Sequence, residues 1–246
     1  MENNKSSSGV GENLSGVGVN LGLITYADSN YKEKQEKLCL LCKEMEIFNV
    51  YYTYSKKDID AEFYNANKNI LIRPRGSGYW LWKPYLILKA LNKLNANDIL
   101  MYLDSGDTFM RSPREFLLNW RLLPNLPNCH NILLTKGGYK HSDWTKKDCF
   151  SLMGCDKPEY HNEIQVEAGI IVCKKTPFAI AIFEDWLAWC RNSAIITDDP
   201  NTTGDNYPGF IDHRHDQSVL TNLAIQHKIP TTNDMREFVR CNDGIF

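Results

Sequence analysis

The sequence has no hydrophobic run that approaches the ~20 apolar residues needed to cross a membrane. Its first 20 residues also lack the cationic start and apolar stretch of a signal peptide. Basic residues are not in excess, since 28 Lys and Arg stand against 30 Asp and Glu, for a formal net charge of -2. Nonspecific nucleic-acid binding depends on such an excess. We therefore expect a cytoplasmic protein with no membrane span and no nucleic-acid partner.

Little in the sequence points to disulfides or to a zinc site. A domain of this size does not need its eight cysteines as cross-links, and the cytoplasm would keep them reduced. Cys39 and Cys42 form the only CxxC, and no second pair follows at zinc-site spacing. Because Leu38, Leu41, Cys42 and Met45 recur at helical spacing, these thiols are expected in the core.

Apolar residues are almost missing from residues 1–20, which are rich in Gly, Ser and Asn. Such a segment has too little to bury, and we expect a disordered N-terminal tail. Neither an internal repeat nor a linker divides the remaining residues 21–246, which are expected to form one domain.

Short apolar runs alternate with longer stretches of helical periodicity in this domain. The alternation is typical of an α/β fold of Rossmann-like type, with a mainly parallel central sheet and helices on both faces. The predicted strands are 21–26, 48–54, 69–72, 99–103, 131–135 and 166–173, and the predicted helices are 31–47, 84–94, 113–122, 145–153, 176–191 and 216–227. Residues 193–214 lack periodicity, which predicts a mobile lid or binding loop.

Two carboxylates follow the uniformly apolar strand predicted at 99–103, in the sequence Asp104-Ser105-Gly106-Asp107. Ligands of open parallel sheets bind beyond the carboxyl ends of the strands, so these side chains are expected at a site. Carboxylates suit Mg2+ or Mn2+, with phosphate oxygens and water completing the coordination. Alternatively, Asp104 caps the turn and Asp107 begins the next helix.

A glycine-rich segment before a helix predicts an anion site in RPRGSGYWLWKP, residues 73–84. Pro84 suits the first turn of a helix, so Lys83 is expected to be extended at its N-terminus, beside free N–H groups that favour phosphate. Arg75 brings further positive charge. Trp80 could stack on a base or a sugar, with core packing as the alternative.

A dense polar cluster lies at the start of the helix predicted at 216–227. Its members are Asp212, His213, Arg214, His215, Asp216 and Gln217. Capping needs fewer polar groups, so a site is favoured over a solvated helix start, with either histidine as a candidate ligand of metal or phosphate.

A fourth segment opens the strand predicted at 166–173. The small pair Ala168-Gly169 leaves space beside the sheet, and Glu167 could accept hydrogen bonds from sugar hydroxyls. The start of a surface strand explains this segment nearly as well.

The order of these segments resembles that of one enzyme family. GYWLWKPYLILKAL, ILMYLDSGD, EAGIIV with a Trp-containing helix, and HRHDQSVLTNLA follow one another over about residues 21–230. The order resembles nucleotide-sugar-dependent glycosyltransferases of the GT-A fold. The similarity is greatest to small capsule or lipopolysaccharide-type glycosyltransferases of bacteria and large DNA viruses with a GYWxWKP segment.

The resemblance implies a divalent metal, Mn2+ or Mg2+, held on the donor diphosphate by a DXD motif whose first position Asp104 matches. The second carboxylate, Asp107, comes one residue late, so Asp107 or a histidine such as His213 would complete the metal site. HDQS at residues 215–218 resembles the segment that lies near the anomeric carbon in retaining members. Gln217 stands at the position nearest that carbon and cannot be a carboxylate nucleophile.

The resemblance also implies a role for each site residue. Catalytic roles are expected for Asp216, Gln217 and Glu167, and metal binding for Asp104, Asp107 and His213. Donor binding is expected for Thr25, Tyr26, Arg75, Trp80, Lys83, Asp104, Ser105, Ala168, Gly169 and His215.

We therefore expect a glycosyltransferase that moves a sugar from a nucleoside diphosphate, with UDP favoured, to a hydroxyl of a glycan or lipid-linked acceptor. The donor sugar, the acceptor and the stereochemical outcome stay open. One alternative is a haloacid-dehalogenase-like phosphatase, because DSGDT is similar to a DxDGT nucleophile motif, although the Gly and second Asp are transposed and the motif lies mid-chain. The other is a non-catalytic sugar-binding module.

Overall fold

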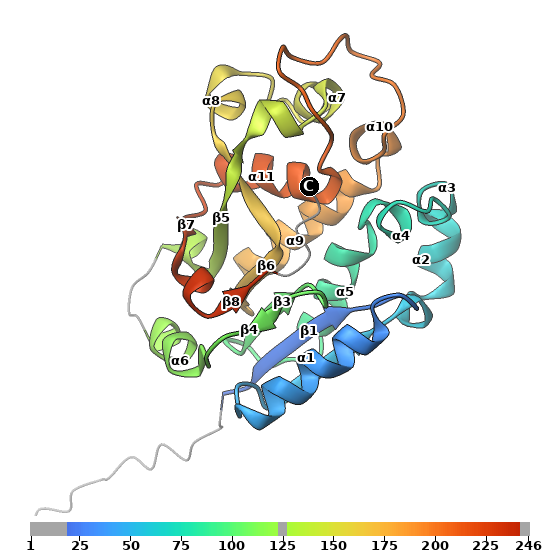
Figure 1. Cartoon of the computed structure of the whole chain (residues 1–246). Coiled ribbons are helices and arrows are strands. Elements are labelled where there is room, and N and C mark those ends of the chain that lie inside the picture. Colours follow the sequence, from blue (N-terminus) through green and yellow to red (C-terminus); the bar gives the residue numbers. More distant parts are fainter. Residues whose placement is uncertain (1–18, 123–126, 242–246) are drawn as a thin grey trace, which may run out of the picture.

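The computed structural model of the chain describes residues 19–122 and 127–241 (Figure 1). Apart from its last two residues, the tail expected over residues 1–20 lies outside this range. No helix in the described part of the chain is long and apolar enough to cross a membrane.

The described residues form a six-stranded sheet with the order β2-β1-β3-β6-β5-β7. Strand β1 is parallel to β2 and β3, β6 is antiparallel to β3 and β5, and β7 is parallel to β5. Only β6 therefore runs against the other strands of this sheet, which confirms the mainly parallel α/β fold. The bounds are β1 (Leu21–Tyr26), β2 (Val50–Tyr54), β3 (Ile99–Leu103), β5 (Ile132–Lys140), β6 (Ile164–Lys174) and β7 (Thr231–Thr232), beside a separate pair of β4 (Thr108–Phe109) and β8 (Val239–Arg240).

Helices cover both faces of the sheet because successive strand residues point to opposite sides. In β3, Leu100 and Tyr102 face a core that also contains residues of α5, α9 and α11, whereas Met101 and Leu103 face a core with residues of α1 and α6. The helices are α1 (Lys32–Glu44), α2 (Ala61–Ala66), α3 (Lys68–Leu71), α4 (Gly76–Tyr79), α5 (Trp82–Leu91), α6 (Arg114–Leu122), α7 (Lys147–Leu152), α8 (Pro158–His161), α9 (Pro177–Cys190), α10 (Ser193–Ile196) and α11 (His215–Gln226). Short 3-10 turns are η1 (Lys56–Asp58), η2 (Asn128–Asn131), η3 (His141–Trp144) and η4 (Asp234–Glu237).

The strand predicted at 69–72 is wrong, because this segment belongs to α3. Ile70 and Leu71 are buried, while Ile72 is 56% exposed. The run of three apolar residues at 70–72 fits a half-buried helical turn as well as a strand, and periodicity does not separate the two.

Strand β6 bulges where it passes the end of β3. Its pairing with β5 jumps from Leu134–Ile171 to Thr135–Glu167, which leaves residues 168–170 without partners on β5. A bulge of this kind frees backbone groups for other contacts. It also places Ala168 and Gly169 beyond the last β3 residue, Leu103, which pairs with Ile170.

Candidate active site

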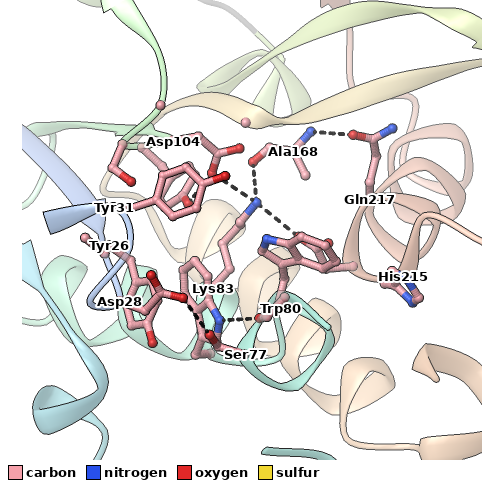
Figure 2. A pocket seen from close by; sticks show the side chains of 18 of the residues that line it. Tyr26, Asp28, Tyr31, Ser77, Trp80, Lys83, Asp104, Ala168, His215 and Gln217 are labelled. Carbon is pink, nitrogen blue, oxygen red and sulfur yellow. Dashed lines mark hydrogen bonds and ion pairs between the residues drawn. The ribbon is translucent and has the colours of Figure 1, made fainter. Parts of the chain in front are cut away.

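A cavity of about 500 Å3 opens at the carboxyl ends of β1 and β3. Its walls come from the segment before α5, the bulge of β6 and the start of α11 (Figure 2). The lining residues are Tyr26, Ala27, Asp28, Tyr31, Pro74, Arg75, Gly76, Ser77, Trp80, Trp82, Lys83, Tyr102, Asp104, Ser105, Gly106, Asp107, Ala168, Gly169, Arg214, His215, Asp216 and Gln217. The structure thus brings together residues from all four segments singled out in the sequence.

Asp104 and Asp107 direct their carboxylates to the same place beside Gly169. A tight turn links them, since the N–H of Asp107 donates to the carbonyl of Asp104 at 3.0 Å. A Cβ added to Gly169 would lie 2.8 Å from Oδ2 of Asp104 and 3.8 Å from Oδ2 of Asp107. A side chain at this position would force the Asp104 carboxylate to move.

Lys83 lies beneath this pair, and its side chain is only 3% exposed. Its Nζ donates to the carbonyl of Ala168 at 3.1 Å and lies 3.5 Å from Asp104 and 3.3 Å from Asp216. The contact with Ala168 is a hydrogen bond, and the contacts with Asp104 and Asp216 are ion pairs. Lys83 is thus paired with two carboxylates of the cavity that it lines. Its contact with the donor diphosphate stays a prediction.

The charges of this buried group are coupled. Burial disfavours the charged ammonium, but Asp104 and Asp216 outweigh it and raise the pKa of Lys83 above its ordinary value. Burial also raises the pKa of Asp216 to about 6, against the opposing attraction of Lys83. Lys83 is therefore the cation that lets the buried Asp216 ionise near neutral pH.

The segment before α5 is a left-handed turn, which the sequence did not predict. Residues 76–80 all have positive φ, including Ser77 at 51°, Tyr79 at 54° and Trp80 at 58°. Left-handed residues other than glycine cost about 1–2 kcal/mol each, and such strain gathers at functional sites. The turn sets the positions of Ser77 and Trp80 in the cavity wall.

Lys83 is also not extended, contrary to the prediction from Pro84. Helix α5 begins at Trp82 and includes both residues. A proline in the first helical turn costs no hydrogen bond, because the N–H groups of that turn have no partner within the helix.

Aromatic and acidic side chains form the end of the cavity next to β1. Tyr26 stacks on Trp82 with ring centroids 3.7 Å apart. Ser77 donates from its hydroxyl to Asp28 at 3.3 Å, and Tyr31 completes this end. Because Tyr26 and Trp82 are buried against each other, the partly exposed ring of Tyr31 is the surface at this end on which a flat ligand could stack.

Gln217 stands at the opposite end, near Trp80 and His215 (Figure 2). Its amide is fixed, since Oε1 accepts from the N–H of Ala168 at 3.3 Å and Nε2 donates to Gln165 at 2.9 Å. The side chain therefore presents one orientation to a ligand.

Three predicted site residues do not line the cavity. Thr25 is fully buried below it. Glu167 forms an ion pair with Arg236 on the other side of the bulge. His213 uses both ring nitrogens, with Nε2 2.8 Å from the carbonyl of Ile195 and Nδ1 accepting from the N–H of Lys146. His213 has no nitrogen left for a metal, so its assignment as a ligand is corrected.

Arg75 lines the cavity but is already paired with carboxylates. Its guanidinium binds Asp212 and, at 3.1 Å, Asp198, which raises the pKa of Arg75 further above its ordinary value. Arg73 lies 3.5 Å from Asp199. These contacts attach residues 198–212 to the glycine-rich segment. The start of the stretch predicted to lack periodicity forms α10, whereas its mobility stays a prediction.

Sequence reasoning missed Asp28, Tyr31 and Tyr102. Asp28 lies just past the end of β1. Ligands bind beyond the carboxyl ends of parallel strands, and the same argument that identified Asp104 could have identified Asp28. Tyr102 donates from its hydroxyl to Asp104 at 2.5 Å, but nothing in its apolar strand signals that role.

No protein-family model and no curated protein matches the chain. Similar solved structures include a glycosyltransferase involved in glycosylation of the major capsid of PBCV-1, with 11% identity, coverage of 79% of this chain and 81% of the other, and a TM-score of 0.41. Mouse xyloside xylosyltransferase 1 is 10% identical, the match covers 87% of this chain and 84% of that protein, and the TM-score is 0.43. The galactosyltransferase LgtC, solved with donor and acceptor sugar analogues, is 13% identical. The match covers 82% of this chain and 70% of LgtC, with a TM-score of 0.44. Similarities of this size leave the activity of the present chain to be argued from its own site.

Proposed function

We propose that the chain is a glycosyltransferase that moves a sugar from a nucleoside diphosphate to a hydroxyl of a glycan or lipid-linked acceptor. One observation carries the proposal. A single cavity joins the aromatic and acidic end at Tyr26 and Asp28, through the carboxylates of Asp104 and Asp107, to the end at Gln217. These parts suit a nucleoside, a diphosphate and a sugar in that order. The segment order described above supports a single GT-A domain over residues 21–246. A cytoplasmic location is proposed from the sequence.

The carboxylates of the cavity fit a divalent cation. Asp104 and Asp107 share the space beside Gly169, and oxygen ligands of this kind suit Mg2+ or Mn2+. No cluster of three or more His, Cys, Asp or Glu that could hold a metal occurs among the described residues. Two carboxylates are nevertheless enough for a cation whose other ligands are diphosphate oxygens and water. When bound, the cation would neutralise charge that develops on the departing diphosphate.

The charge balance of the cavity supports the same assignment. Four carboxylates line it, those of Asp28, Asp104, Asp107 and Asp216, against three cations. Lys83 and Arg75 are paired with carboxylates, and Arg214 lies over the ring of Trp144. With more carboxylates than cations, the cavity offers a diphosphate no net attraction unless it brings positive charge with it. We expect the donor to bind together with a divalent cation, with UDP the favoured nucleoside diphosphate.

The chain's own residues would bind and orient the donor. The partly exposed ring of Tyr31 and the carboxylate of Asp28 suit the nucleoside, and Ser77 extends this surface. Lys83 holds Asp216 as a carboxylate facing the sugar, and Gln217 is fixed beside it. Fixed polar groups of this kind stabilise charge without reorganising during the reaction. The bond from the anomeric carbon to the diphosphate breaks, a bond from that carbon to the acceptor oxygen forms, and the proton of the acceptor hydroxyl passes to the departing diphosphate.

A thermal-shift screen tests the proposal. UDP, GDP and their sugars are compared with and without Mn2+, because a ligand at a hundred times its dissociation constant stabilises by about 2.7 kcal/mol. We expect stabilisation by one nucleoside diphosphate that depends on the cation and is lost in Asp104→Asn. Release of phosphate from a phosphomonoester would support the phosphatase instead. Stabilisation by free sugars alone would support a sugar-binding module.

A further inference from the structure

Trp80 and His215 lie at the end of the cavity away from Tyr26 and Asp28 (Figure 2). The sequence assigns both residues to donor binding without saying which part of the donor each one contacts. Their rings stack at a centroid distance of 5.6 Å and an interplanar angle of 25°. They meet from distant parts of the chain, the left-handed turn before α5 and the first residue of α11.

The indole of Trp80 is fixed by the turn that carries it. A Cβ on Gly76 would lie 2.4 Å from the nearest atom of the Trp80 ring, so the ring packs directly on the backbone of Gly76. Trp80 itself has φ 58°, which points its side chain into the cavity wall rather than along a normal helix. The ring is half-buried and lines the cavity, as a platform for a ligand would.

His215 offers a hydrogen-bond acceptor that no group in the described part of the chain uses. Its Nδ1 lies 2.8 Å from the carbonyl of Ile196, so Nδ1 carries the proton, since a carbonyl only accepts. In the neutral ring, Nε2 is then an acceptor. This atom is buried and has no hydrogen-bond partner, with Asp198, itself an acceptor, 3.7 Å away. Burial lowers the pKa of His215 to about 4, which keeps the ring neutral at pH 7.

A buried acceptor without a donor is costly unless a ligand supplies one. A sugar has a C–H face that packs on an aromatic ring and hydroxyls that donate at its edge. We propose that Trp80 and His215 recognise the transferred sugar of the donor, which packs on the indole and donates one hydroxyl to Nε2 of His215. This inference rests on the proposed function. It assigns the choice of sugar to these two side chains, because a sugar without a hydroxyl at that place leaves Nε2 unpaired.

The test compares binding of a nucleotide sugar with binding of the same nucleoside diphosphate without its sugar. Isothermal titration calorimetry with Mn2+ uses UDP, UDP-glucose, UDP-galactose and UDP-N-acetylglucosamine, with GDP and GDP-mannose as the second series. His215→Asn is chosen because Asn tolerates the φ of 48° at this position and its amide can still donate to Ile196, while the Nε2 acceptor is lost. Trp80→Asn removes the ring with the same tolerance, and Trp80→Phe keeps an aromatic surface.

We expect His215→Asn and Trp80→Asn to weaken binding of the preferred nucleotide sugar about tenfold and binding of its nucleoside diphosphate less than about twofold. Trp80→Phe should fall between wild type and Trp80→Asn. Equal losses for both ligands, or unchanged affinity for the nucleotide sugar, would overturn the inference. So would a change confined to the KM of the acceptor. If the wild-type protein binds no nucleotide sugar at all, the proposed function itself has failed.

Discussion

The ammonium of Lys83 lies 3.3 Å from a carboxylate oxygen of Asp216, and the two side chains are only 3% and 5% exposed. Removing one partner of a buried ion pair leaves an unpaired buried charge. We expect Lys83→Met to lower the free energy of unfolding by about 3–5 kcal/mol, measured by urea denaturation. Lys89→Met is the control, because Lys89 pairs with the exposed Asp60 and should lose no more than about 1 kcal/mol. Similar losses in both variants would show that the burial of Lys83 does not increase the effect of its removal on the free energy of unfolding.

Gly169→Ala tests the space shared by Asp104 and Asp107. The new Cβ would lie 2.8 Å from Oδ2 of Asp104, so the carboxylate must move. We expect affinity for Mn2+ in the presence of nucleoside diphosphate to fall at least about tenfold, which corresponds to about 1.4 kcal/mol. Gly138→Ala is the matched control on β5, since its Cβ meets no heavy atom within 4 Å. Unchanged metal affinity in Gly169→Ala would remove Asp104 from the cation site.

Arg75→Gln should loosen the segment 198–212. The guanidinium of Arg75 binds Asp198 and Asp212, and these contacts cross between parts of the chain far apart in sequence. We expect amide hydrogen exchange in this segment to become about fivefold faster, because the loss of one partly exposed ion-pair cluster costs about 1 kcal/mol. Arg111→Gln, which breaks the exposed pair with Glu237, is the control and should leave the segment unchanged. No change in Arg75→Gln would mean that other contacts hold the segment.

Asp156 predicts a pH dependence of stability away from the cavity. Burial would raise its pKa, but hydrogen bonds from Lys147, Tyr207 and Ser151 lower it to about 2. A carboxyl group with a lowered folded-state pKa stabilises above its unfolded pKa near 4, and this contribution is lost as the pH falls toward 2. The free energy of unfolding of Asp156→Asn should therefore be lower than wild type at pH 6 and should converge on it near pH 2. Asp205→Asn, at an exposed position nearby, should show no such convergence.

Much of the fold could be predicted from local pattern. The apolar run at 99–103 is β3 residue for residue, because a strand buried on both faces must be apolar throughout. The same reasoning placed Asp104 at the site. It failed at 69–72, where a half-buried helix has the same short apolar run.

The chemistry of Lys83 could not be predicted from its neighbours in sequence. Its partners Asp104, Ala168 and Asp216 come from β3, the β6 bulge and α11, and only the tertiary fold brings them together. The left-handed turn at 76–80 could not be predicted from the sequence pattern either. The ring of Trp80 packs against Gly76, where a Cβ would lie 2.4 Å from it, and the spacing of the two residues does not reveal this contact.

Strand β6 links the two parts of the cavity mechanically. Its residues 170–174 pair with β3, and residues on both sides of the bulge, 164–167 and 171–173, pair with β5, so one continuous strand spans the site. A hinge between the Tyr26 end and the Gln217 end of the cavity would have to bend this strand at the bulge that contacts Lys83 and Asp104. The width of the cavity is thus set by the fold, and ligands of different size would be accommodated by side-chain rotations and by the segment 198–212 rather than by domain closure.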